Sequence, residues 1–268
     1  MVYRCGACRN EAGEFSLVCP WCGAWMTLVP ARESRDVDSL PLPLPDVPPS
    51  TVPRMKTRIG SVDALVGGGF VTGSSVLLTG PPGAGKSTLL LQLLDSSAQS
   101  ALYVSGEESI QQLKLRADRL HIHSRAISVL FETNVDTVVS HVRRVPPGML
   151  VIDSIQTVYT ELSDSIPGTT VQIRKCTYLL RRLAQEKGMV LLVVGQVTKG
   201  LQAAGPKTLE HAVDCVLSIG MTGEHPDIRT LSVIKNRFGP AGSLLSLMMT
   251  GDGFAVPKEG EQWMRVPA

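Results

Sequence analysis

The stretch of the chain with the clearest chemistry covers residues 80–88 and reads Gly-Pro-Pro-Gly-Ala-Gly-Lys-Ser-Thr. It fits G-x-x-x-x-G-K-S/T, the pattern typical of a phosphate-binding loop, or P-loop. The apolar residues 75–79 before it predict a buried strand, and the apolar residues 89–94 after it predict a helix. In that setting the glycines let backbone N–H groups turn toward a phosphate chain, and the positive end of the helix faces the same anion.

Two side chains of this loop have predicted roles of their own. Lys86 is expected to reach the β- and γ-phosphates of ATP, and the Ser87 hydroxyl is expected to ligate Mg²⁺. The alternative is a glycine-rich turn without a ligand, and the preceding strand, the lysine and the hydroxyl argue against it. The residues predicted to bind the nucleotide are Gly80, Pro81, Pro82, Gly83, Ala84, Gly85, Lys86, Ser87 and Thr88.

Acidic residues follow the next predicted strand, at residues 101–105. A carboxylate at the carboxyl end of a strand beside a P-loop can orient and polarise the attacking water. Glu107 is the first candidate for this role and Glu108 the second. The alternative is that both acids begin the predicted helix at residues 109–120, where negative charge is favourable in the first turn.

Two further strand ends carry polar side chains. Asp153 ends the apolar run at residues 149–153 in the manner of a Walker B aspartate, and we expect it to hold Mg²⁺ through water; the alternative is a helix cap. Gln196 follows the apolar run at residues 189–194 and is placed to sense the γ-phosphate, with Lys199 reporting toward the next loop. For both of these residues the alternative is an ordinary polar turn after a strand.

A different chemistry is indicated at the start of the chain. Cys5, Cys8, Cys19 and Cys22 form two C-x₂-C pairs separated by ten residues, which is typical of a tetrahedral Zn²⁺ site. A segment this short cannot bury a useful core, so metal binding would supply its folding energy. With four protein ligands the site is expected to be structural rather than catalytic; the alternatives are disulfides or free thiols. The lone cysteines, Cys176 and Cys215, are expected in the core.

These motifs divide the chain into three parts. We expect a four-cysteine zinc module at residues 1–28, a proline-rich extended linker at residues 29–54 and a P-loop ATPase domain at residues 55–268. In the last part, apolar strands alternate with amphipathic helices. The predicted fold class is therefore α/β, with a mostly parallel central sheet flanked by helices and an antiparallel edge.

Composition limits the classes of function. The net charge is +2, so a DNA site would have to be a local basic patch rather than a property of the whole surface. The predicted helix that ends at Lys187 carries four basic residues away from its apolar stripe, namely Arg174, Lys175, Arg181 and Arg182. These residues either form a solvated face or contact a phosphate backbone. No apolar run approaches the roughly 20 residues that span a bilayer, and we expect a cytoplasmic protein without membrane contact.

Several motifs together resemble the bacterial RadA (Sms) family of RecA-like DNA-repair ATPases. Besides the cysteines and the P-loop, the resemblance rests on residues 65–69 (Leu-Val-Gly-Gly-Gly), 103–109 (Tyr-Val-Ser-Gly-Glu-Glu-Ser), 114–120, 151–159, 205–211 and 235–239 (Lys-Asn-Arg-Phe-Gly). It covers nearly all of the chain. The sequence departs from the family's usual pattern at Pro81-Pro82 and at Gln196 in place of a histidine, and we expect it to lack the family's C-terminal Lon-protease-like domain.

The resemblance implies a hexameric, DNA-stimulated ATPase that drives branch migration at recombination intermediates. It implies ATP, Mg²⁺ and Zn²⁺ as cofactors, single-stranded or branched DNA as substrate, and a recombinase or replicative helicase as protein partner. It also implies that Lys235 and Arg237 act near the nucleotide, across a subunit interface. Such charges contribute roughly 10³–10⁵ in turnover when they stabilise a transferring phosphoryl group. From the residues alone, a cationic turn would be the preferred interpretation.

Two competing functions follow from the same motifs. The chain could be an ATP-gated adaptor with little turnover, in which the zinc module docks a recombinase or helicase. It could also be a clock-type RecA-like regulator, although that hypothesis leaves the four cysteines unexplained.

Overall fold

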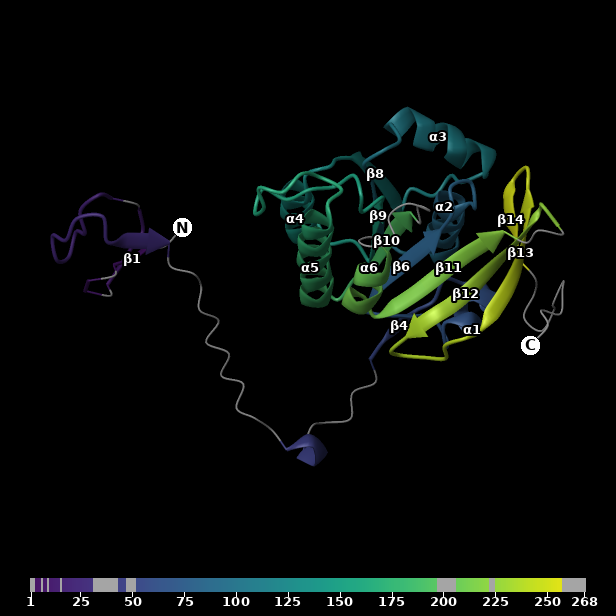
Figure 1. Cartoon of the computed structure of the whole chain (residues 1–268), viewed down its shortest axis with the longest axis horizontal. Helices are drawn as coiled ribbons and strands as arrows, with labels where there is room; N and C mark the ends of the chain where they lie inside the picture. Colours follow the sequence, from purple (N-terminus) through teal and green to yellow (C-terminus); the bar gives the residue numbers. More distant parts are fainter. Residues whose placement is uncertain are drawn as a thin grey trace. The chain divides into compact units, whose positions relative to one another are not determined.

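The computed structural model describes residues 3–5, 7–8, 10–14, 16–30, 43–46, 52–196, 206–221 and 225–256 (Figure 1). The chain divides into two compact units, Met1–Ser50 and Thr51–Ala268. Lys199, for which a role was predicted, lies outside the described residues. No helix among the described residues is long and apolar enough to cross a membrane.

The N-terminal unit holds a small antiparallel sheet. Its strand order is β2-β1-β3, with β1 at Tyr3–Cys5, β2 at Glu11–Ala12 and β3 at Leu28–Pro30. Strand β3 passes the predicted end of the module at residue 28, because its last residue pairs with the first residue of β1. A single 3₁₀ turn, η1 (Leu44–Asp46), lies in the predicted linker.

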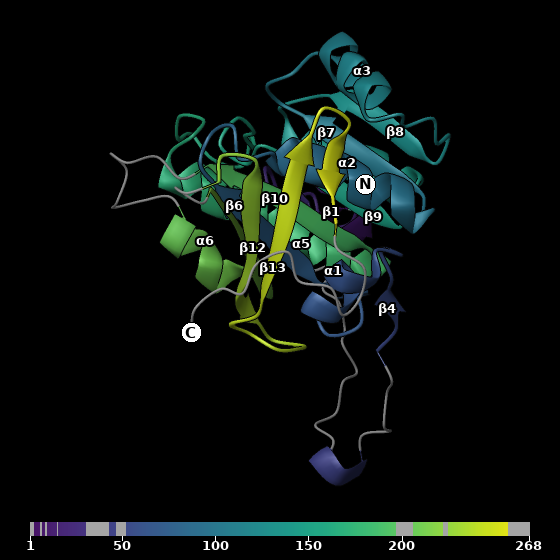
Figure 2. The same ribbon diagram turned by 90° about the vertical axis from the view of Figure 1, so that its right-hand side faces the viewer.

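The second unit is built on a nine-stranded sheet with the order β14-β13-β12-β11-β6-β10-β9-β7-β8 (Figures 1 and 2). The six strands from β11 to β8 are parallel, and β12, β13 and β14 extend the sheet in antiparallel fashion. The predicted fold class is confirmed. The strands are β6 (Ser75–Gly80), β7 (Ala101–Ser105), β8 (Ile127–Phe131), β9 (Met149–Asp153), β10 (Val190–Gln196), β11 (Cys215–Met221), β12 (Ile228–Asn236), β13 (Leu244–Thr250) and β14 (Gly253–Ala255).

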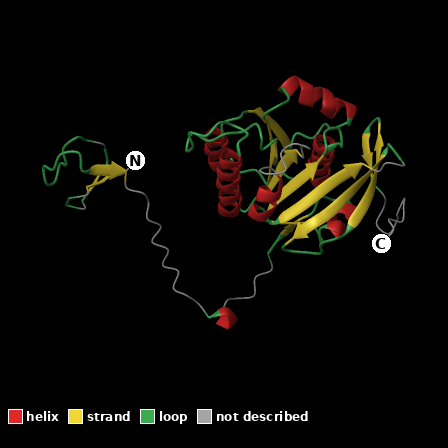
Figure 3. Ribbon diagram, viewed as in Figure 1, coloured by secondary structure: helices red, strands yellow, loops and turns green. Residues whose placement is uncertain are grey.

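Helices cover both faces of this sheet (Figure 3). One hydrophobic core lies under α1, α2 and α3, and a second core lies under α4, α5 and α6. Successive residues of β6 supply them alternately, Leu77 to the second core and Leu78 to the first, as a pleated strand requires. The helices are α1 (Gly60–Leu65), α2 (Lys86–Ser97), α3 (Ile110–Arg119), α4 (Val135–Arg144), α5 (Thr170–Lys187) and α6 (Pro206–Ala212). A separate pair, β4 (Arg54–Met55) and β5 (Phe70–Val71), flanks α1.

Local sequence signals account for the helix boundaries. Ser109 caps α3 in a capping box with Gln112, and the Asn134 side chain accepts a hydrogen bond from the Asp136 amide at the start of α4. Several elements differ from the prediction. Helix α6 and strands β4 and β5 were not predicted. Strand β10 continues to Gln196 and β12 to Asn236, so Gln196 and Lys235 belong to strands and not to turns.

Candidate functional site

The P-loop connects β6 to α2, as the motif requires. Two of its glycines have backbone conformations or neighbours that exclude a side chain. A Cβ on Gly80 would lie 2.4 Å from the Ile219 carbonyl oxygen, and one on Gly85 would lie 2.6 Å from Phe254. Gly85 also has a φ of 96° and is the N-cap of α2, so the helix begins directly beside the loop with its free N–H groups.

Lys86 is held against the loop itself. Its ammonium donates hydrogen bonds to the carbonyls of Gly80, at 2.8 Å, and Pro81, at 3.0 Å. Burial lowers the pKa of Lys86, and the nearby carboxylates of Asp153 and Glu107 oppose this shift. The lysine charge therefore lies among the carboxyl ends of three strands, where a phosphate group would meet it.

Asp153 and Ser87, the two predicted magnesium ligands, are in direct contact. The Ser87 hydroxyl donates a hydrogen bond of 2.6 Å to Asp153 Oδ2. The buried Tyr103 hydroxyl donates to the same oxygen, and burial together with the charge of Asp153 raises the Tyr103 pKa, which keeps the phenol protonated. A hydroxyl and a carboxylate at one point suit Mg²⁺, which prefers oxygen ligands.

Glu107 and Gln196 also meet at this edge of the sheet. Glu107 accepts hydrogen bonds from the Ser154 hydroxyl, at 2.5 Å, and from the Gln196 amide, at 3.0 and 3.2 Å. Glu108 instead forms an ion pair with Arg116 of α3. Of the two acids, only Glu107 therefore faces the P-loop lysine and the Walker B strand.

Lys235 and Arg237 are not brought to this edge. In β12, Asn236 pairs with Cys215 of β11, and Cys215 pairs with Val76 of β6. Asn236 is therefore level with the start of β6, four residues before Gly80, which is about 13 Å along a strand at ~3.3 Å per residue. The Lys-Asn-Arg segment begins at the opposite end of the sheet from its own P-loop.

At that end the cations have partners within the chain. Lys235 donates to the carbonyls of Glu210, at 2.7 Å, and Val213, at 2.8 Å, at the end of α6. Burial first, and the charge of Arg237 second, lower the Lys235 pKa. Arg237 donates a hydrogen bond of 3.1 Å to the carboxylate of Asp214.

Asp214 is a site residue that sequence reasoning missed. Its side chain is 4 % exposed, and it pairs with both Arg237 and Arg181. The signal in the sequence is an aspartate between the apolar residues Val213 and Cys215, because a buried charge needs partners. Arg181 therefore does not lie on the simple solvated face that was one expectation for the basic residues of α5.

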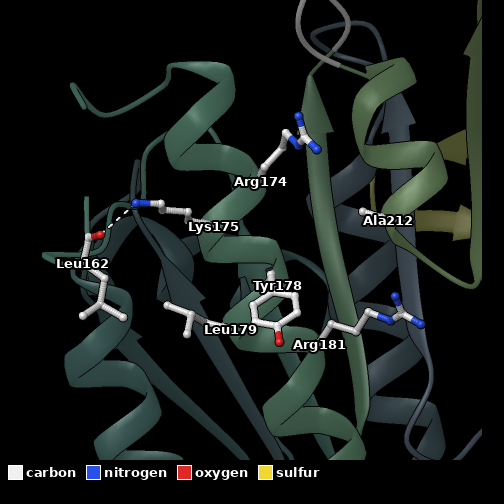
Figure 4. A pocket seen from close by; sticks show the side chains of 7 residues that line it. All are labelled: Leu162, Arg174, Lys175, Tyr178, Leu179, Arg181 and Ala212. Atoms are coloured by element: carbon white, nitrogen blue, oxygen red, sulfur yellow. Dashed lines mark hydrogen bonds between the residues drawn. The ribbon is translucent and has the colours of Figure 1, made fainter. Parts of the chain in front are cut away.

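A pocket of about 470 Å³ lies along α5, with Leu162 of the preceding loop on one side and Ala212 of α6 on the other (Figure 4). In Figure 4, Arg174 and Arg181 extend from α5 toward Ala212 of α6, whereas Lys175 and Leu179 lie on the side of Leu162. The pocket is lined by Leu162, Arg174, Lys175, Tyr178, Leu179, Arg181 and Ala212. Its lining residues therefore include three cations and no carboxylate.

The four cysteines of the N-terminal unit form a cluster. Their Sγ atoms all lie within 4.8 Å of one another, and the Cys5–Cys22 and Cys8–Cys19 distances are both 3.7 Å. A disulfide has an S–S distance near 2.05 Å, so these thiols are unpaired. A hydrogen bond from the Thr27 hydroxyl is the main cause that lowers the Cys5 pKa to about 6. Four such sulfur atoms fit a tetrahedral zinc ion.

The lone cysteines behave as predicted. Cys176 and Cys215 are buried, and burial raises the pKa of each thiol to about 12. Both are core residues.

Fold and site together define the class of this protein. The family described as "ATPase: KaiC" matches residues 55–244, and the chain belongs to that family of P-loop ATPases. Two solved structures share the fold at 22% identity. A KaiC-like protein of Pyrococcus horikoshii OT3 gives a TM-score of 0.64 over 77% of this chain and 99% of its own. The RadB recombinase gives a TM-score of 0.59 over 75% of this chain and 98% of its own.

Individual relatives narrow the comparison. The chain is 42% identical, over 93% of its length, to the DNA repair protein RadA of Bacillus subtilis (strain 168). It is 40% identical, over 94% of its length, to the DNA repair protein RadA of Aquifex aeolicus (strain VF5). The predicted resemblance to the RadA family is confirmed. The chain spans 58% of the length of each of these relatives.

Proposed function

We propose that this chain is a DNA-dependent ATPase of homologous recombination and DNA repair, which acts on single-stranded or branched recombination intermediates. The observation that carries the proposal is the split of the predicted machinery between two ends of one sheet. The P-loop, Asp153 and Glu107 lie at one end, and Lys235 and Arg237 lie near the other. A site that contains both sets needs two protomers, so a ring or filament of identical subunits, most simply a hexamer, is part of the proposal.

Within one protomer, the P-loop amides and Lys86 bind the triphosphate. Ser87 and Asp153 would hold Mg²⁺, which neutralises charge on the phosphate oxygens when it is bound. Glu107 orients the attacking water and accepts its proton, while Ser154 and Gln196 hold the carboxylate in place. We infer that Gln196 responds to loss of the γ-phosphate through that same hydrogen bond.

The second protomer supplies the cations that the first protomer does not bring to its own P-loop. Arg237, which is 48 % exposed, and Lys235 would face the γ-phosphate bound by a neighbour. Cations that approach a transferring phosphoryl group in this way act as trans fingers. The name of the RadA relatives, DNA repair protein, supports DNA as the effector that couples turnover to assembly.

The direct test measures ATP hydrolysis by the purified chain at low salt, with and without single-stranded DNA. We expect DNA to raise the rate, and Lys86→Ala to abolish hydrolysis in both conditions. Equal rates with and without DNA would contradict the proposal.

A second function has one observation in its favour. Trp21 and Trp25 of the cysteine module are 65 % and 66 % exposed, which is unusual for large aromatic side chains outside an interface. An ATP-gated adaptor that docks a recombinase or helicase through this module would use that surface. The adaptor hypothesis predicts nucleotide-dependent assembly with negligible ATP turnover, so the same hydrolysis assay separates the two functions. A clock-type regulator is less well supported, because the KaiC match begins at residue 55 whereas the RadA similarity spans over nine-tenths of the chain.

A further inference from the structure

Three cations meet around one buried carboxylate at the end of the sheet away from the P-loop. Lys235 and Arg237 come from the end of β12, and Arg181 comes from α5. Among the described residues, Asp214 is the one acid that pairs with either guanidinium, and it bonds both. Two guanidinium groups therefore share a single carboxylate, whose charge can neutralise only one of them.

The Asp214 carboxylate is fixed on one side by the strand that leads to the P-loop. Its Oδ2 accepts hydrogen bonds from the Ser75 amide, at 3.0 Å, and from the Ser75 hydroxyl, at 2.7 Å. The Asp214 amide in turn donates to the Ser75 carbonyl at 3.0 Å. These bonds hold Oδ2 against the first residue of β6, so that Oδ1 is the oxygen left to accept from the two guanidinium groups.

Oδ1 is the oxygen that holds Arg237. The guanidinium donates to it at 3.1 Å, and the Arg237 amide donates to the Asp214 carbonyl at 3.0 Å. Arg181 reaches the same oxygen at 3.4 Å. Arg237 is thus fixed at both its backbone and its side chain, yet a guanidinium has five N–H donors and the described contacts use one of them.

We propose that Asp214 is a positioning residue, which holds the Arg237 guanidinium so that its remaining donors face the triphosphate of a neighbouring protomer. This inference rests on the proposed function and adds a residue to it. Asp214 itself touches neither nucleotide nor metal. Without the carboxylate, the long arginine side chain would sample several rotamers, and few of them would meet a phosphate held by another subunit.

The test compares Asp214→Asn with the matched control Arg181→Ala under DNA-stimulated conditions. Asparagine keeps the shape of aspartate and can still accept from Ser75, but it loses the charge that orients Arg237. We expect kcat to fall about 10- to 100-fold, the effect of a misplaced catalytic group, with KM for ATP and the oligomer mass unchanged. Arg181→Ala removes the other guanidinium from the same oxygen and should leave kcat within about threefold, since Arg237 keeps its partner.

A double-mutant cycle identifies the residue through which Asp214 acts. Arg237→Ala alone should lower kcat, and adding Asp214→Asn to that variant should lower kcat no further. Additive losses, or a loss in Arg181→Ala as large as in Asp214→Asn, would overturn the inference. Thermal unfolding is followed in parallel, and if Asp214→Asn does not fold, Asp214→Ser, which also removes the charge, is judged by the same criteria.

The outcomes also separate this inference from the proposed function. If Arg237→Ala hydrolyses ATP at the normal rate, the trans site itself is wrong. If Arg237→Ala is impaired and Asp214→Asn is normal, only the positioning role of Asp214 is wrong.

Discussion

The Ser87 hydroxyl lies 2.6 Å from the carboxylate of Asp153 and donates a hydrogen bond to it. The contact joins the first turn of α2 to the end of β9, which are 66 residues apart in the chain. It brings the two predicted magnesium ligands together, so the metal-dependent part of the site can be tested first.

Asp153→Asn should weaken magnesium binding more than nucleotide binding. The neutral amide keeps the shape of the side chain but loses the charge that attracts a divalent cation. We expect the Mg²⁺ concentration for half-maximal hydrolysis to rise, with the maximal rate at least tenfold lower. A magnesium titration of ATPase activity measures both quantities, and an unchanged titration midpoint would show that Asp153 is not a metal-site residue.

Tyr103→Phe should lower the hydrolysis rate without unfolding the protein. The phenol donates one of two hydrogen bonds to Asp153 Oδ2, and a hydrogen bond to a charged group contributes about 1.5–3 kcal/mol. We expect turnover to fall about tenfold if that energy serves to orient the carboxylate. Tyr159→Phe is the matched control, since this tyrosine lies outside the phosphate site. Equal rates in the two variants would remove Tyr103 from the site.

Glu107→Gln and Glu108→Gln should differ sharply. Glu107 faces the P-loop lysine and Glu108 is paired with Arg116, so only the first substitution removes the base that activates water. We expect Glu107→Gln to bind ATP with nearly normal affinity and to hydrolyse it at least 100-fold more slowly. Glu108→Gln should remain within about threefold of the normal rate, since a partly exposed ion pair contributes little. Single-turnover hydrolysis with radiolabelled ATP tests both, and the reverse ranking would exchange the roles of the two acids.

Removal of metal should affect the two units differently. Four thiolates within 4.8 Å of one another predict one zinc ion per chain, and Cys19→Ser should lose it. Because Thr51–Ala268 forms its own compact unit, its thermal unfolding should change little in that variant. Elemental analysis and calorimetry measure the two effects. A chain without zinc, or a large fall in the unfolding temperature of the ATPase unit, would contradict this assignment.

Much of this architecture follows from sequence patterns that are purely local. The short apolar runs predicted β7 and β9 with the bounds that the structure has, because each run is continuous and ends in a polar residue. The apolar stripe predicted α5 and its end at Lys187. The P-loop, Asp153 and Glu107 were also identified in this way. Each lies at the carboxyl end of a predicted strand, and such ends meet at one edge of a parallel sheet.

What sequence reasoning missed depends on which strands are neighbours. Tyr103 looks like a core residue of a buried strand until β7 pairs with β9 and brings its hydroxyl to Asp153. The partners of Asp214 likewise come from β6, α5 and the end of β12, which local patterns do not place together. The same holds for Lys235, because only the antiparallel pairing of β11 and β12 shows which end of the sheet it occupies.

The central claim is that each active site is shared by two protomers, and mixing two inactive variants tests it most directly. Lys86→Ala removes the P-loop cation and Arg237→Ala removes the proposed trans cation, so neither variant alone should hydrolyse ATP with DNA present. In an equal mixture, about a quarter of interfaces would join an intact P-loop to an intact Arg237, and we predict that activity returns to that extent. If the mixture remains as inactive as its components while both variants assemble normally, the shared site is contradicted.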